Sequence, residues 1–133
     1  MNPNNVIMES NNQEKLTILW VCNAPYGRAC ELLGINHAQS GSWISATSEE
    51  LMSIKGVKLC IATATPLVSK LTRILDKNIC YIFIPGETER GKRSSSVTRN
   101  NWQRLISLVQ PDIIQVWGTE FSNGLDVISQ NDD

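Results

Sequence analysis

Short runs of apolar residues, separated by polar segments, form the main pattern in this sequence. Two of these runs, Leu16–Cys22 and Val57–Ala62, are almost wholly apolar and rich in β-branched residues, without alternation of apolar and polar positions. A third run, Asp112–Trp117, begins directly after Pro111. Strands that are buried on both faces have this pattern, which is typical of parallel sheets. We therefore expect these three runs to be central strands of a parallel sheet.

Two further runs predict a hairpin. Leu71–Leu75 and Ile79–Ile84 are separated only by Asp76-Lys77-Asn78. A short connection that contains Asp and Asn favours a tight turn between antiparallel strands. We expect the second run to be a strand of the sheet and the first to fold back against it.

Helical spacing of apolar residues occurs in three places. Ser40 or Ser42 can cap a helix that ends at Lys55-Gly56. Thr98 can cap a second helix, which Gln110-Pro111 stops. Residues 121–128 predict a third amphipathic helix.

Two long polar segments, Asn23–Gln39 and Pro85–Val97, lie between these elements, and we expect both to be loops. The order of elements is thus strand, helix, strand, hairpin, helix, strand, helix. Right-handed connections between parallel strands place helices on the faces of the sheet. The sequence therefore predicts an α/β protein, a Rossmann-like three-layer sandwich with a mostly parallel sheet.

Length and composition limit the class of protein. The chain has 133 residues, enough for one domain, and its 41% hydrophobic and 19% charged residues are ordinary for a globular protein. The Asn-rich residues 1–14 lack periodicity, so we expect a disordered tail before a single domain over residues 15–133. A net charge of −1 gives no long-range field, so nucleic acid is not an expected partner. No apolar run approaches the ~20 residues of a membrane span.

The four cysteines form no Cys-x-x-Cys pair and have no metal-ligand spacing. Three of them, Cys22, Cys60 and Cys80, fall within predicted strands, where a free thiol behaves as a small apolar side chain. We expect reduced thiols, no metal site and a cytoplasmic location.

Polar residues next to the predicted strands and helices are the candidate site. Asn23 directly follows the first strand. In Trp117-Gly118-Thr119-Glu120, Trp117 is the last residue of the final strand and the other three residues follow it. Ligands of open α/β sheets bind beyond the carboxyl ends of the strands. Gly41 and Ser42 stand at a helix start, where unpaired backbone N–H groups favour an anion. The plainer interpretations stay open: Ser42 as a helix cap, and Glu120 as a charge in the first turn of the next helix.

Other candidates are weaker. His37 is the single histidine and lies in the first long loop, where it could hydrogen-bond to a ligand. Cationic side chains in the two loops suit phosphates but are more often solvated; these are Arg28, Arg90, Lys92 and Arg93.

Three segments in this order resemble the N-terminal domain of family-4 glycosyltransferases, retaining enzymes of the GT-B fold. They are Ile18-Leu19-Trp20-Val21-Cys22-Asn23, Ser40-Gly41-Ser42-Trp43-Ile44 and Pro111-Asp112-Ile113-Ile114-Gln115-Val116-Trp117-Gly118-Thr119-Glu120. The resemblance covers most of the chain from Lys15 to Ile128. It rests on the order and spacing of the segments, since each segment alone is weakly specific.

The resemblance implies one half of a two-domain enzyme that transfers a sugar from a nucleotide-diphosphate donor to an acceptor with retention. It implies that Asn23, Gly41, Ser42 and residues 117–120 bind substrate, that no cofactor is needed, and that the C-terminal half holds the nucleotide sugar. That half is missing here, so the domain is truncated and inactive alone. The implied acceptor is a sugar or lipid-linked glycan of polysaccharide or cell-envelope synthesis, met in the cytoplasm or at the inner face of the membrane.

This chain departs from the family at one point. Many relatives have histidines at the positions of Gln115 and Trp117, so the resemblance leaves the catalytic residues unknown. Retaining transfer by front-side attack does not require a protein base there, because the leaving phosphate can take the acceptor proton.

Other function classes account for the sequence less well. A receiver domain needs acidic residues after the first strand, and a dinucleotide-binding oxidoreductase needs a glycine fingerprint there; neither is present. A non-catalytic interaction or assembly module, with self-association through an uncovered apolar face, stays open. Sequence beyond Asp133 that carries a second domain would favour the enzyme.

Overall fold

A computed structural model describes residues 15–35, 42–86, 95–117 and 126–127. Within them the strands are β1 (Leu16–Cys22), β2 (Val57–Thr65), β3 (Thr72–Asp76), β4 (Ile79–Pro85) and β5 (Ile113–Trp117). They form one sheet in the order β3-β4-β2-β1-β5. β1 pairs in parallel with β2 and β5, β2 pairs in parallel with β4, and only β3 is antiparallel. The prediction of an α/β protein with a mostly parallel sheet is therefore confirmed.

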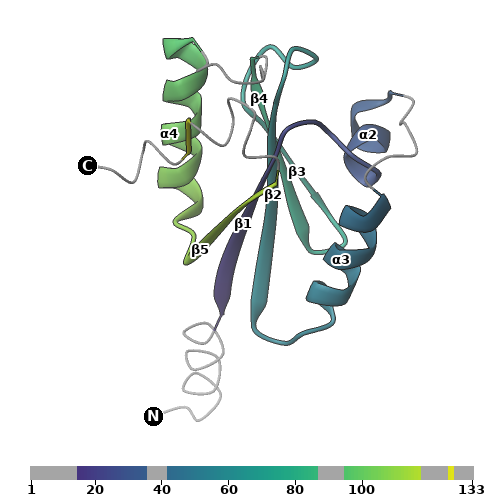
Figure 1. Ribbon diagram of the computed structural model, residues 1–133. Helices are drawn as coiled ribbons and strands as arrows, with labels where there is room; N and C mark the ends of the chain where they lie inside the picture. The colour runs from purple at the N-terminus through teal and green to yellow at the C-terminus, as the bar shows by residue number, and fades with distance from the viewer. Residues whose placement is uncertain (1–14, 36–41, 87–94, 118–125, 128–133) are drawn as a thin grey trace, which may run out of the picture.

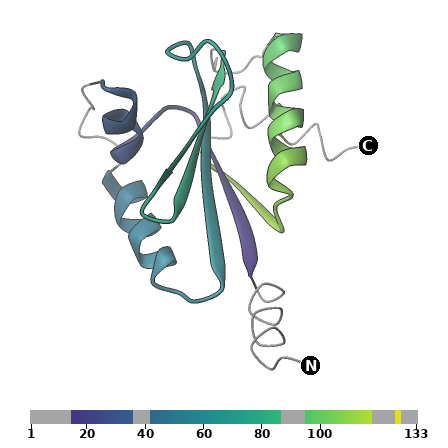
Figure 2. The same cartoon turned by 180° about the vertical axis from the view of Figure 1, so that it is seen from behind.

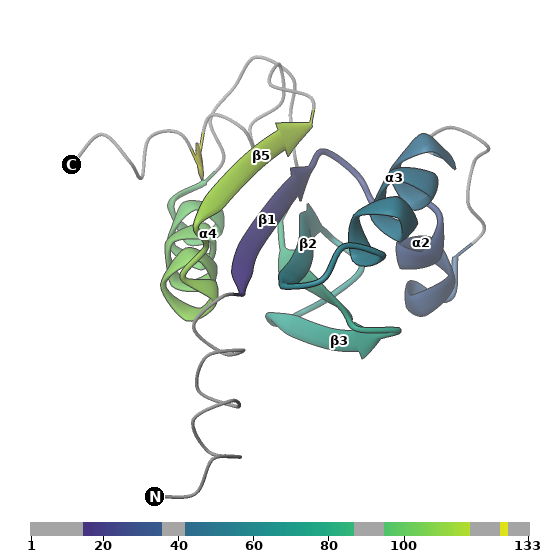
Figure 3. The same cartoon turned by 90° about the horizontal axis from the view of Figure 1, so that it is seen from below.

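Helices flank this sheet on both faces (Figures 1 and 2). α2 (Arg28–Leu33) and α3 (Ser42–Met52) connect β1 to β2 and cover one face, whereas α4 (Ser96–Val109) connects β4 to β5 and covers the other. Figure 3, a view from below, shows α4 and the α2–α3 pair on opposite sides of the strands. This arrangement is compatible with a Rossmann-like fold.

Two apolar clusters fill the space between the sheet and its helices. Alternate residues of a strand point to opposite faces, so Ile18, Trp20 and Cys22 belong to the cluster under α2 and α3. Leu19 and Val21 belong to the cluster under α4, with the fully buried Trp102 of that helix. β1 and β2 are apolar on both faces because both faces are covered.

The hairpin is confirmed. β3 and β4 pair in antiparallel register from Thr72↔Phe83 to Asp76↔Ile79. The two residues between them, Lys77 and Asn78, both have positive φ, 48° and 69°. This is the conformation of the two-residue turns that match the twist of paired strands.

Several predicted boundaries are wrong. The segment 23–39 is not wholly a loop, since it contains α2, and α3 ends at Met52 rather than at Lys55-Gly56. β2 runs to Thr65 rather than Ala62, because its last three residues are buried and pair with β4. α4 is capped by Ser95 rather than Thr98: the Ser95 hydroxyl accepts a hydrogen bond from the Thr98 backbone N–H.

Two further predictions, the N-terminal tail and the last helix, concern residues that are wholly or mostly outside the described part of the chain. The predicted tail, residues 1–14, lies outside the described residues, as does most of the predicted helix over 121–128. Asp126 and Val127 are described as helical and fully buried, and Val127 belongs to the cluster under α4. Among the helices that the structure describes, none is long and apolar enough to cross a membrane.

Candidate functional site

The direction in which successive parallel strands are added to the sheet reverses at one point. From β1 the chain passes through α2 and α3 to β2 on one side, and from β4 it passes through α4 to β5 on the other side of β1. The first connection, α2 and α3, covers one face of the sheet, and the second connection, α4, covers the other face (Figure 3). The reversal of strand order therefore lies between β1 and β5. In open α/β sheets, such a reversal of strand order is where ligands bind, beyond the carboxyl ends of the strands.

The described candidates lie at this edge. Cys22 and Trp117, the last residues of β1 and β5, are register partners, so the two strands end side by side. Asn23 leaves β1 at this point. Ser42 begins α3, which runs back along the sheet toward the start of β2, so the amino end of this helix also lies toward the carboxyl edge (Figure 1). The other candidates outside α2 lie beyond the described residues: Gly41, Gly118, Thr119, Glu120, His37, Arg90, Lys92 and Arg93.

Side-chain contacts hold Asn23 and Trp117 in place. The Tyr26 hydroxyl donates a hydrogen bond of 2.6 Å to Asn23 Oδ1. The Trp117 ring meets Trp20 edge to face, with ring centroids 5.5 Å apart and an interplanar angle of 80°. Trp117 thus packs against the core with one side of its ring, and the Asn23 side-chain amide group keeps its two N–H donors for other contacts.

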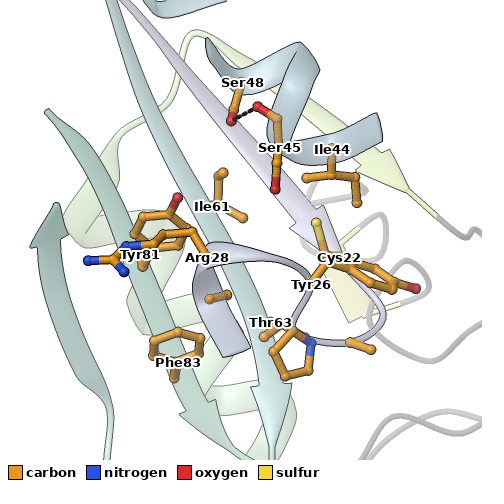
Figure 4. A pocket seen from close by; sticks show the side chains of 13 residues that line it. Cys22, Tyr26, Arg28, Ile44, Ser45, Ser48, Ile61, Thr63, Tyr81 and Phe83 are labelled. Carbon is orange, nitrogen blue, oxygen red and sulfur yellow. Dashed lines mark hydrogen bonds between the residues drawn. The ribbon is translucent and has the colours of Figure 1, made fainter. Parts of the chain in front are cut away.

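A pocket adjoins this edge on the face that α2 and α3 cover (Figure 4). Its walls come from the carboxyl-terminal halves of β1, β2 and β4, from the segment after β1, and from α2 and the first turns of α3. Residues with hydroxyl groups line it from three elements: Ser45 of α3, Thr63 of β2, whose hydroxyl donates to the Ala64 carbonyl, and Tyr81 of β4. The remaining lining residues are Cys22, Ala24, Pro25, Tyr26, Arg28, Ala29, Ile44, Ser48, Ile61 and Phe83. The enclosed space has room for about one water molecule, so a larger ligand reaches only its mouth.

The entry into α2 closes the pocket. Gly27 has φ 51° and ψ −118°, a conformation that L side chains rarely adopt. A Cβ atom there would overlap the Ser45 hydroxyl. Glycine at this position therefore lets the backbone before α2 lie directly against α3.

Arg28 is neutralised by two carboxylates. Its Nε and Nη2 donate to Asp76 at 2.9 and 3.0 Å, and its Nη1 donates to Glu31 at 2.6 Å. The hydrogen bonds with Asp76 and Glu31 raise the pKa of the guanidinium group, and the hydrogen bond from Arg28 lowers the pKa of Asp76. Arg28 ties α2 to the end of β3, and its interaction with two anions makes it a poor phosphate ligand.

The chemistry available in the pocket is hydrogen bonding. The residues that line it include no Asp, Glu or His. Burial raises the pKa of the Cys22 thiol to about 12, so this sulfur is no nucleophile at neutral pH. Hydroxyl groups on an otherwise apolar wall suit a neutral polyol better than a substrate that needs acid–base catalysis.

Sequence reasoning missed most of this pocket. Ser45, Thr63 and Tyr81 are far apart in the chain, and only the sheet order brings them together. One signal was present, since Thr63 and Thr65 interrupt an apolar run at the carboxyl end of a strand.

No metal centre is formed by the described residues, among which no group of three or more His, Cys, Asp or Glu side chains gathers. Comparisons of the chain with protein-family models, with curated proteins and with solved structures found no match.

Proposed function

We propose that this chain is a Rossmann-like three-layer domain that forms the acceptor-side half of a retaining GT-B glycosyltransferase. In this proposal the nucleotide-sugar donor binds mainly to a separate C-terminal half, and the edge beyond β1 and β5 receives the acceptor. The products are polysaccharides or cell-envelope glycans, made in the cytoplasm or at the inner face of the membrane. The domain is catalytically inert by itself.

One observation carries the proposal: the strand order reverses between β1 and β5, whose last residues Cys22 and Trp117 are register partners. This is the position at which a doubly wound sheet binds ligands. Asn23, Ser42 and Trp117 belong to the motifs that resemble the transferase family; Asn23 and Trp117 lie at this edge, and the amino end of α3, at Ser42, points toward it. This placement supports the proposal that the motif residues meet a ligand at this edge.

The composition of the pocket supports an acceptor rather than a catalytic role. A sugar offers several hydroxyl groups that both donate and accept hydrogen bonds. The Ser45 hydroxyl, which is partly exposed at the pocket, does the same, while Pro25 and Tyr26, also partly exposed there, provide apolar surface for a sugar at the mouth. No base is required in this half, since a leaving phosphate held by the other half can take the acceptor proton.

Saturation-transfer NMR of the 133-residue chain, with a panel of sugars and nucleotide sugars, tests the proposal. We expect weak binding of at least one sugar, and about 3- to 10-fold weaker binding for Ser45→Ala, because one neutral hydrogen bond contributes about 0.5–1.5 kcal/mol. Ser53→Ala is the matched control, because Ser53 lies beyond the far end of α3 and its hydroxyl bonds only to the Glu50 carbonyl. Silence with every sugar and donor, or equal losses in the two variants, would count against an acceptor site.

One observation favours an assembly module as a second candidate. β5 is the end strand of the described sheet, and Ile113 at its start is 46% exposed. An edge strand with an exposed apolar residue can pair with a second chain. If the chain is an assembly module, sedimentation velocity would show a dimer, and Ile113→Lys would convert it to a monomer. If the chain is only an acceptor-side domain, the original chain and the Ile113→Lys variant would both be monomers.

A further inference from the structure

Two cysteines face each other across neighbouring strands, away from the pocket. Cys60 of β2 and Cys80 of β4 are register partners. Both belong to the α4 side of the sheet, where Cys60 is buried in the apolar cluster and Cys80 is partly exposed at its margin. Their thiols are hydrogen-bonded to each other.

The spacing of paired strands suits a bond between these two sulfur atoms. Neighbouring strands lie about 4.8 Å apart. Disulfides join residues whose Cα atoms are about 4.4–6.8 Å apart. In-register partners with side chains on one face meet that condition without a change in strand order.

Two cationic side chains, Lys58 and Arg73, lie on the same face of the sheet as the cysteines. Lys58 precedes Cys60 by two residues and therefore lies on the same face of β2. Arg73 of β3 pairs with Ile82, two residues beyond Cys80 on that face. The hydrogen bond with Cys60, together with the charges of Arg73 and Lys58, lowers the pKa of Cys80 to about 7. The same hydrogen bond and burial raise the pKa of Cys60.

The other two cysteines differ. Burial raises the pKa of Cys22 to about 12, and burial followed by the charge of Glu31 raises the pKa of Cys30. Both thiols are buried, and the Cys30 thiol donates to the Pro25 carbonyl. Reactive cysteines are partly exposed and lie in electropositive surroundings, a description that fits Cys80 alone.

We propose that Cys80 and Cys60 form a site of reversible oxidation by small-molecule disulfides. The Cys80 thiolate attacks one sulfur of the disulfide, forms a mixed disulfide and expels the other half as a thiolate. Cys60 then attacks the Cys80 sulfur, which forms the Cys60–Cys80 bond and expels the second half, and the Cys60 proton passes to that departing thiolate. Two electrons pass from the protein thiols to the small disulfide, which becomes two thiols. This inference does not depend on sugar transfer.

Oxidised glutathione added to the native chain tests the proposal, with mass spectrometry of the intact protein and of its peptides. We expect the loss of two hydrogen atoms, a peptide pair joined by Cys60 and Cys80, and reversal by dithiothreitol. Cys60→Ser should stop at one glutathionyl group on Cys80, because the resolving thiol is gone. Cys80→Ser should remain unmodified.

A second measurement needs no variant and so does not depend on whether the substituted chains fold. Brief alkylation of the native chain with iodoacetamide, followed by peptide mapping, should label Cys80 first, with a rate that rises around pH 7. Equal labelling of all four cysteines, labelling of Cys22 or Cys30 first, or a joined peptide pair other than Cys60–Cys80 would overturn the proposal.

Discussion

Single residues fix how closely the elements around the pocket approach. Gly27 has a backbone conformation that suits glycine, and the space where a side chain would project is filled by the Ser45 hydroxyl. Gly34, at the other end of α2, also has a positive φ of 73°, but a Cβ atom there would meet no other atom within 4 Å. Gly34 is in the left-handed helical region, whereas Gly27, with ψ −118°, lies outside it, so a side chain at Gly27 would meet both greater backbone strain and steric overlap.

Gly27→Ala should destabilise the protein more than Gly34→Ala. Strain alone is worth about 1–2 kcal/mol for each residue in the left-handed region, which is the effect that we expect at Gly34. Gly27→Ala adds overlap with Ser45, and we expect about 2–4 kcal/mol in urea unfolding. Adding Ser45→Ala should restore part of that loss. Equal effects of the two glycine substitutions would show that α2 and α3 do not meet as described.

The ion pair between Arg28 and Asp76 predicts a dependence of stability on pH. The hydrogen bond from Arg28 lowers the pKa of Asp76 in the folded protein below its ordinary value of 3.8. The unfolded state then binds a proton more readily, so the stabilisation is complete above about pH 4 and disappears as the pH falls through the lower, folded pKa.

Asp76→Asn should therefore be less stable than the original chain at pH 7, and the difference should vanish in strong acid. Thermal unfolding of both proteins between pH 2 and 7 measures this difference. Because the pair is solvent-exposed, 1 M salt should reduce the difference at pH 7. A difference that is constant with pH would contradict the role assigned to the Asp76 carboxylate.

At the scale of elements, the turn between β3 and β4 offers a direct test of the hairpin. Lys77 and Asn78 both have positive φ, yet the pair preferred in such turns is Asn-Gly. The double substitution Lys77→Asn with Asn78→Gly should raise stability by about 1 kcal/mol, because the left-handed conformation then carries less strain. Chemical denaturation measures this change in the free energy of unfolding. Asn78→Val should lower the stability. If Asn78→Val were more stable than the double variant, the turn would have a different conformation.

The elements themselves differ in how far sequence predicts them. Leu16–Cys22 was predicted with the bounds that the structure has, because a strand covered on both faces is apolar throughout. α2 was missed, since six residues between Gly27 and Gly34 are too few to show helical periodicity. The cap of α4 was misplaced because Ser95 and Thr98 are both good caps, and only the structure shows which one accepts the hydrogen bond.

At the scale of the whole molecule, the strand order decides where a ligand can bind. The sequence predicts parallel strands, but it does not predict that β1 lies between β2 and β5. That order depends on which face of the sheet each connecting helix covers, because each crossover is right-handed. This order brings Asn23 and Trp117 to one edge, as expected for residues at the carboxyl ends of parallel strands, and adds pocket residues such as Thr63 that no motif identified.

The central claim is that this edge binds a sugar. Amide correlation spectra of the 133-residue chain, recorded during titration with the sugars and nucleotide sugars, locate the binding site residue by residue. We predict that the shifts concentrate at Asn23, Ser45 and Thr63, while Gln103 and Leu108 on the exposed side of α4 stay unchanged. Shifts confined to α4, or no shift with any of these ligands, would contradict the account.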